Sequence, residues 1–254
     1  MKTPVKINLK IKLLSFFWLV MVVSISPILI ILAIRTKKIT LRLPEATGEP
    51  YGCCKPANSS VKQNLIFIGE SPVAGVGVET YQQSIAAQAA RHLSEMTETT
   101  VCWRAIGKNG ITIEKTIDSL IPKVPEQTID YLVVMLGVND VTSLKSLKHW
   151  HQSISKLVSK IRRFTNAPIL VYSCPPLAQF PALPKPLAIA AGTRAHLFDQ
   201  VTQHHPLNNI EFKFSQFKAN IVTTQFAADG YHPSEAGCIE MGKRIATDLM
   251  ALKR

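Results

Sequence analysis

The stretch of sequence that decides the fold is the run Leu65-Ile66-Phe67-Ile68-Gly69-Glu70-Ser71-Pro72. Its first four residues are apolar without interruption, which is typical of a strand that is buried on both faces of a sheet. Similar apolar runs follow at residues 101–106, 131–136 and 169–173. The sequence therefore predicts four buried strands, of which residues 65–69 form the first.

Helical patterns separate these strands. Residues 85–93, 113–120 and 147–164 carry apolar side chains at a spacing of three to four, as one face of a helix does. A last helix is expected from Pro233 to about Leu252, because proline suits the first turn of a helix. Strands that alternate with helices favour a parallel sheet covered by helices. We therefore predict an α/β fold with a central parallel sheet for residues 64–254.

The net charge of +12 is concentrated at the N-terminus. Eight lysines and arginines precede the first acidic residue, Glu45, and removing these eight charges from +12 leaves +4 for the rest of the chain. Between them, Leu13 to Ile34 form an uncharged run that is long enough, at about 1.5 Å per helical residue, to cross a bilayer core of about 30 Å. Basic residues beside an apolar run favour a membrane surface, so a nucleic-acid partner is not expected.

This run predicts one transmembrane helix, and we assign residues 1–39 to an N-terminal membrane anchor. A cleaved signal peptide is the alternative, but its apolar region is usually about 7 to 15 residues long and ends at a small-residue site. Four basic residues flank each side of the run, so their balance does not fix the orientation. We expect the folded domain to lie outside the cytoplasm, in a periplasmic or extracellular position.

Two proline-containing segments are expected to lack regular structure. Residues 40–63 are predicted to be a polar linker, because prolines, glycines and small polar residues are typical of a stalk. Pro175 to Pro186 holds too many prolines for a helix or a central strand, so it is predicted to be a loop that borders a substrate cleft. Its Phe180 is the candidate residue for contact with the acyl group of a substrate.

Polar blocks follow the predicted strands and precede the last helix. Because ligands meet the carboxyl ends of parallel strands, these blocks are the candidate site. They read Gly69-Glu70-Ser71-Pro72, Gly107-Lys108-Asn109-Gly110-Ile111-Thr112, Gly137-Val138-Asn139-Asp140 and Asp229-Gly230-Tyr231-His232-Pro233.

The residue types in these blocks suit acyl transfer. A serine hydroxyl is a poor nucleophile unless a base takes its proton, and His232 is the candidate base for Ser71. Asp229 stands three residues before His232, where its carboxylate can orient the imidazole. We therefore predict a catalytic triad of Ser71, His232 and Asp229. Asp140 is expected to have a structural role in a turn.

In this order, the four blocks resemble those of the SGNH (GDSL) hydrolase family over nearly the whole of residues 64–254. The resemblance implies a flavodoxin-like three-layer α/β/α fold. It also implies an oxyanion hole made by the backbone N–H groups of Ser71 and Gly110 and the side-chain amide of Asn139. Gly107 is the weaker candidate for the second donor, because Gly110 stands two residues before Thr112, as in the family's Gly-x-Thr. The chain departs from the family at Glu70, where an aspartate is usual.

The resulting interpretation is a serine esterase that acts on a small-molecule, glycan or lipid ester without a metal or other cofactor. An O-acyltransferase of the same fold is one alternative, since it shares the acyl-enzyme step. A catalytically silent, membrane-tethered ligand-binding module is the other. The sequence contains no Gly-x-Ser-x-Gly elbow, phosphate loop or His-Glu-x-x-His motif, so the enzyme classes that carry them are disfavoured.

Five cysteines, Cys53, Cys54, Cys102, Cys174 and Cys238, show neither a metal-ligand spacing nor a disulfide framework. Cys102 and Cys174 lie in apolar surroundings, and we expect them to be small buried side chains. The sequence leaves the disulfide state open.

Overall fold

A computed structural model describes residues 8–56, 61–217 and 220–252 of the chain. In these residues one sheet has the strand order β1-β3-β2-β4-β5-β6. The strands are β1 (Tyr51–Cys54), β2 (Lys62–Gly69), β3 (Thr100–Gly107), β4 (Tyr131–Met135), β5 (Ile169–Tyr172) and β6 (Lys213–Ser215). Strands β2 to β6 are parallel, and β1 is antiparallel to β3 at one edge. The parallel strands have the order of flavodoxin-like folds, so the predicted α/β fold with a parallel sheet is confirmed.

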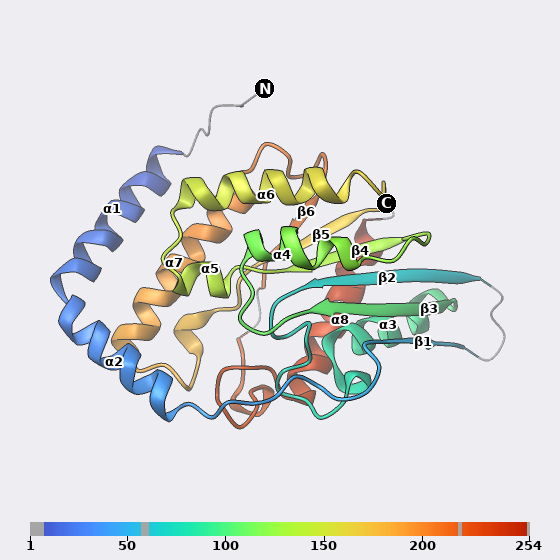
Figure 1. Ribbon diagram of the computed structural model, residues 1–254, viewed down its shortest axis with the longest axis horizontal. Coiled ribbons are helices and arrows are strands. Elements are labelled where there is room, and N and C mark those ends of the chain that lie inside the picture. The colour runs from blue at the N-terminus through green and yellow to red at the C-terminus, as the bar shows by residue number, and fades with distance from the viewer. Residues whose placement is uncertain (1–7, 57–60, 218–219, 253–254) are drawn as a thin grey trace.

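Helices cover both faces of the sheet and make three layers (Figure 1). One face shares a core with α4 (Ile113–Ser119), α5 (Val138–Thr142), α6 (Leu147–Ile161) and α7 (Lys185–Gln203). The other face shares a core with α3 (Ile85–Thr97) and α8 (Glu235–Ala251). Along β2, Ile66 and Ile68 belong to the first core, whereas Leu65 and Phe67 belong to the second. Both faces exclude water, which explains why the strands are continuously apolar.

The four predicted strands and the four predicted helices are present, with ends that differ by a few residues. Strand β6 and helix α7 were not predicted. Short 3-10 helices in the described part of the chain are η1 (Tyr81–Gln83), η2 (Ile121–Lys123), η3 (Leu177–Gln179) and η4 (Thr223–Gln225). The loop from Pro175 therefore contains η3 and ends where α7 begins, at Lys185.

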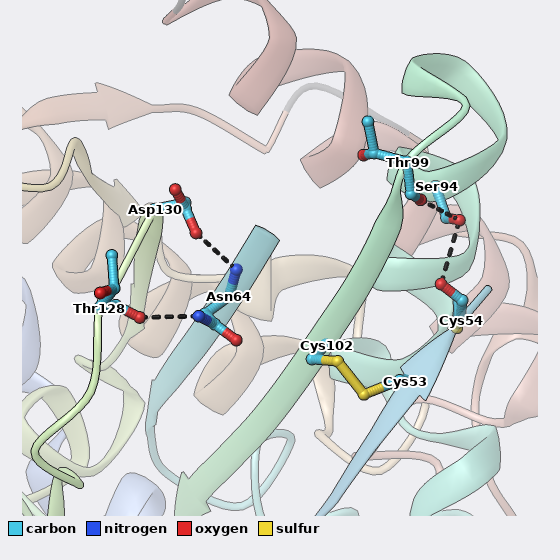
Figure 2. The surroundings of a disulfide bond; sticks show 8 residues. All are labelled: Cys53, Cys54, Asn64, Ser94, Thr99, Cys102, Thr128 and Asp130. Carbon is cyan, nitrogen blue, oxygen red and sulfur yellow. Dashed lines mark hydrogen bonds between the residues drawn. A yellow bond between two sulfur atoms is a disulfide. The ribbon is translucent and has the colours of Figure 1, made fainter. Parts of the chain in front are cut away.

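The sheet already begins inside the expected linker, before the domain boundary predicted at residue 64. Tyr51–Cys54 forms β1, and Cys53 lies directly opposite Cys102 of β3. These two cysteines form a disulfide, which the sequence had not revealed (Figure 2). Next to it, the Ser94 hydroxyl bridges the carbonyl oxygens of Cys54 and Thr99 at 3.2 and 2.6 Å. Residues 57–60 of the linker lie outside the described residues.

The segment before β1 is also attached to the domain. The backbone N–H of Ala46 donates to the carbonyl of Ala74 at 3.2 Å, and that of Thr47 donates to the carbonyl of Glu79 at 2.9 Å. The Glu45 carboxylate accepts from the backbone N–H of Asn109 at 2.7 Å. Of the expected stalk, only residues 40–44 lie between the N-terminal helices and these contacts.

The N-terminal apolar run forms two helices, α1 (Leu9–Ser24) and α2 (Ser26–Ile39), whose axes differ by 80°. Pro27 lies in the first turn of α2, and a proline there interrupts the hydrogen bonds of a continuing helix. Neither helix is by itself long and apolar enough to cross a membrane, although the bent pair together meets the criteria of length and composition. The single transmembrane helix is therefore not confirmed. Residues 1–7 of the expected anchor lie outside the described residues.

Candidate active site

The nucleophile candidate Ser71 lies in the turn that follows β2. The backbone N–H of Glu70 donates to the carbonyl of Met135 in β4 at 3.1 Å, so this turn starts beside the end of the neighbouring strand. Ser71 begins a series of turns, and the next regular element is η1. Its side chain is almost buried, with 8% of the residue exposed.

Ser71, His232 and Asp229 form one chain of hydrogen bonds. The His232 Nε2 atom lies 2.9 Å from the Ser71 Oγ atom, and the His232 Nδ1 atom lies 2.6 Å from the Asp229 Oδ2 atom. A carboxylate only accepts hydrogen bonds, so the proton of a neutral imidazole belongs on Nδ1. Nε2 is then free to accept from the serine hydroxyl. The structure thus brings together three residues that the sequence had predicted as a triad.

Asp229 is fixed by more than the imidazole. Its Oδ1 atom accepts from the backbone N–H groups of Tyr231 at 2.9 Å and His232 at 3.0 Å. Burial by itself would raise the pKa of Asp229, but the hydrogen bonds from His232 and Tyr231 outweigh it and hold the pKa below the usual value. Asp229 is therefore ionised at neutral pH and can stabilise an imidazolium.

Glu70 links the first polar block to the third. Its carboxylate accepts from the backbone N–H groups of Val138 at 3.0 Å and Asn139 at 3.1 Å, and it also accepts from the Asn139 side-chain amide. Burial is the largest influence on this carboxyl and raises its pKa to about 7, against the lowering effect of these donors. The sequence had placed a carboxylate here but had not shown what it binds.

Asn139 is turned toward protein acceptors. Its amide nitrogen donates to Glu70 and, at 3.1 Å, to the carbonyl of Ile111. These two bonds occupy both N–H groups of the amide. The contact with Ile111 places Asn139 beside the residue that follows Gly110. Its oxyanion role stays a prediction, and it requires one of the two bonds to be exchanged for the substrate.

Gly107 and Gly110 must be glycines for different reasons. A side chain on Gly107 would put a Cβ atom 2.3 Å from the backbone nitrogen of Ala74, so this glycine lets β3 pack against the turns that follow Ser71. Gly110 has a φ of +73° and open space around it, a conformation that other residues rarely adopt. In the described part of the chain, the backbone N–H groups of Ser71 and Gly110 have no acceptor. Both remain candidates for oxyanion donors.

Asp140 has the structural position that was expected. Its Oδ2 atom accepts from the backbone N–H of Ile113 at 2.9 Å, where α4 begins. The carboxyl is buried, and burial raises its pKa to about 6. It therefore ties the third block to the second.

An apolar pocket opens beside Ser71 and His232. Phe180, the candidate substrate-contact residue, lines it and is 5% exposed. Its ring packs edge to face against Phe226 at 5.2 Å and Tyr231 at 5.1 Å between centroids. The sequence had not singled out the other apolar lining residues, which include Met135, Leu136, Phe217, Ile221, Phe226, Tyr231 and Met241. They come from separate segments, so no local pattern identifies them.

No group of three His, Cys, Asp or Glu side chains that could hold a metal ion occurs in residues 8–56, 61–217 and 220–252. The site itself offers a hydroxyl, an imidazole, a carboxylate and nearby N–H donors.

Comparison with known proteins finds a family model and a curated relative that match most of the chain. A model of the GDSL-like Lipase/Acylhydrolase family matches residues 67–238. The GDSL-like esterase Rv1075c of Mycobacterium tuberculosis is 26% identical over 183 residues, which cover 67% of this chain and 56% of that protein.

Solved structures agree in fold. The family 3 carbohydrate esterase of Clostridium thermocellum matches with a TM-score of 0.59 and 17% identity over 76% of this chain and 99% of that one. The acetylxylan esterase Axe2 of Geobacillus stearothermophilus, solved as a catalytic mutant, matches with a TM-score of 0.54 and 17% identity over 76% of this chain and 94% of that one. At such identities the likeness establishes the fold alone.

Proposed function

This chain belongs to the GDSL-like lipase and acylhydrolase family, and we propose that it is a serine esterase whose triad is Ser71, His232 and Asp229. The family and its relatives support an ester hydrolase of the SGNH type. The observation that carries the assignment of residues is the continuous hydrogen-bonded chain from Ser71 through His232 to Asp229, at 2.9 and 2.6 Å.

In the first half-reaction, the Ser71 oxygen attacks the carbonyl carbon of the ester while His232 Nε2 takes the hydroxyl proton. Asp229 holds the imidazolium that results. The tetrahedral intermediate then collapses, the bond to the alkoxy group breaks, and His232 returns the proton to the leaving alcohol. Water attacks the acyl-serine by the same route, which releases the carboxylic acid and restores Ser71.

The developing oxyanion needs donors, each of which can be worth about 3 to 4 kcal/mol in the transition state. We assign this role to the backbone N–H groups of Ser71 and Gly110 and to the Asn139 amide. The unoccupied N–H groups of Ser71 and Gly110 support the first two assignments.

The test is hydrolysis of p-nitrophenyl acetate and butyrate by the purified full-length protein. Ser71→Ala and His232→Ala should each remove nearly all activity, and the double variant should be no worse than either single one, because the two residues act as a unit. Circular dichroism controls for folding. A folded Ser71→Ala protein with wild-type activity would contradict the assignment of Ser71 as the nucleophile.

We also infer that the domain lies outside the cytoplasm. The disulfide between Cys53 and Cys102 supports this, since such bonds persist mainly in oxidising compartments. Cells whose proteins are alkylated before lysis should yield a chain in which Cys53 and Cys102 react only after reduction. Reaction of both cysteines without reduction would contradict this location.

A further inference from the structure

Helices α1 and α2 present a large apolar surface to solvent. Their outward side chains include Leu13, Phe16, Phe17, Leu19, Val20, Val23, Ile28, Ile30, Ile31 and Ile34, each of which is about half exposed or more. Soluble proteins rarely expose a continuous apolar patch of this kind, and one normally marks a contact with a partner or a membrane. We therefore expect a partner or a membrane to cover this surface.

The pair is fixed on the catalytic domain by a buried contact with α7 (Figure 1). The Trp18 indole N–H donates to the carbonyl of Ala190 at 2.8 Å, and the Arg194 guanidinium lies 4.5 Å from the centre of the Trp18 ring. Arg194 also donates to the carbonyls of Val141 and Lys145 at 3.2 and 2.5 Å. One side chain thus joins α1, α7 and the end of α5.

The connection after α2 is too short to separate the pair from the domain. Residues 40–45 span the gap to the Ala46–Ala74 hydrogen bond, which gives a reach of about 20 Å at most. The domain is consequently close to whatever α1 and α2 contact, instead of being lifted away on a stalk.

Two exposed apolar side chains of the domain stand next in sequence to residues that contact Trp18 or Arg194, and basic residues lie toward both ends of the helix pair. Leu144, which precedes an Arg194 contact, is 68% exposed, and Ile189, which precedes the Trp18 contact, is 54% exposed. Lys10 and Lys12 lie at the start of α1, and Arg35, Lys37 and Lys38 lie near the end of α2, whereas no acidic residue occurs before Glu45. This pattern complements an apolar layer bounded by anionic headgroups.

We propose that the outer faces of α1 and α2, together with Leu144 and Ile189, form one docking surface for a bilayer that contains anionic lipids. In this arrangement the α7 side of the catalytic domain rests directly on the lipid. The Trp18 and Arg194 contacts set the orientation of the domain, and α7 follows directly on the loop that carries Phe180 of the apolar pocket.

The test places a fluorophore at the domain end of this surface. The full-length protein carries Cys54→Ser, to remove the partly exposed free thiol, and either Ile189→Cys or Met96→Cys. Met96 is a matched control, since it is apolar and 47% exposed. It lies near the end of α3, just before β3 begins. It is therefore near the amino ends of the parallel strands, whereas Ile189 lies in the helix that follows the carboxyl end of β5. Each variant is labelled with an environment-sensitive dye and mixed with vesicles of phosphatidylcholine and phosphatidylglycerol.

The label at residue 189 should shift to the blue and be quenched by spin-labelled lipid, while the label at residue 96 should do neither. If the protein floats with the vesicles but the residue 189 label stays in water, the domain does not rest on lipid and the proposal is overturned. Quenching of both labels would equally overturn it, because binding would then lack the proposed orientation.

Two further variants test the contacts that the proposal uses. Lys37→Gln with Lys38→Gln should weaken binding to these vesicles by about fivefold per charge removed, and unchanged binding would contradict the role of charge. Trp18→Ala should reduce quenching at residue 189 severalfold while flotation persists. Unchanged quenching in that variant would show that α1 does not orient the domain.

Discussion

Glu70 is a buried acid that connects two parts of the site. Glu70 is 4% exposed and its carboxylate accepts from the N–H groups of Val138 and Asn139, so it aligns the turn after β2 with the start of α5. Its pKa is raised to about 7 by burial. The folded state therefore binds this proton more tightly than the unfolded chain does, and the stability that results is complete below about pH 4.5 and is lost as pH rises to about 7.

We predict that Glu70→Gln flattens the dependence of stability on pH. In the wild type, Glu70 should lower the free energy of unfolding by up to about 3 kcal/mol between about pH 4.5 and 7. Asp140 and Asp199 contribute with the same sign, but they are present in both proteins and cancel in the comparison. Urea unfolding at a series of pH values measures the difference, and an identical slope in the two proteins would contradict the raised pKa.

The sequence predicted some residues of the site but not all of the contacts between them. Ser71, Asp229 and His232 could be predicted because each follows or precedes a recognisable element and belongs to a known chemical set. The bonds between Glu70 and Asn139 could not be predicted, because they depend on how closely the turn after β2 approaches the start of α5 in space. The direction of the Asn139 amide likewise follows from Ile111 and Glu70 together, which no spacing along the chain reveals.

At the scale of elements, strand β1 shows what the sequence pattern misses. Tyr51–Cys54 is four residues long and contains Gly52, so it carries little strand preference of its own. Its pairing with β3 and the Cys53–Cys102 disulfide hold it in the sheet. Helix α7 was missed for another reason: it packs on the sheet on one side and on α1 on the other, so its apolar residues do not form a single stripe.

The disulfide should contribute measurably to stability. We predict that Cys53→Ser lowers the free energy of unfolding by about 2 to 4 kcal/mol, because the bond closes a loop between residues 49 positions apart. Cys54→Ser is the matched control, since it makes the same chemical change at the adjacent free cysteine. Urea unfolding under non-reducing conditions compares them, and equal losses would mean that the cross-link contributes nothing.

The pocket loop should determine the acyl preference. Phe180 lines the pocket with Phe226 and Tyr231, so Phe180→Leu should lower kcat/KM for hexanoate esters by roughly tenfold relative to acetate esters. Phe164→Leu, at an exposed phenylalanine outside the pocket, is the control and should change neither. A uniform loss across the ester series would assign Phe180 to packing alone.

At the scale of the whole molecule, the sequence predicted the catalytic domain better than its attachment. The uncharged run from Leu13 to Ile34 suggested one straight helix, but Pro27 starts a second helix at 80° to the first. The proline was visible in the sequence, whereas the Trp18 contact with α7 was not. The domain's fold was predictable because β4 and β5 are completely buried and β2 is buried from Leu65 to Gly69, a condition that leaves a clear pattern in the chain.

The same architecture gathers the site at the carboxyl ends of the parallel strands. Ser71 follows β2, Asn139 follows β4, and His232 precedes α8, so the proposed triad is assembled only when the sheet and its last helix have packed. We therefore expect catalytic activity to report on the complete domain.

Covalent labelling of the purified full-length protein by a fluorophosphonate probe tests the central claim most directly. The probe reacts with an activated serine and not with a pocket alone, so it separates an esterase from a silent binding module. We predict that peptide mass spectrometry finds the adduct on Ser71, and that labelling is lost in Ser71→Ala and strongly slowed in His232→Ala. A folded wild-type protein that stays unlabelled, or one that is labelled at another serine, would contradict the assignment of Ser71 as the nucleophile.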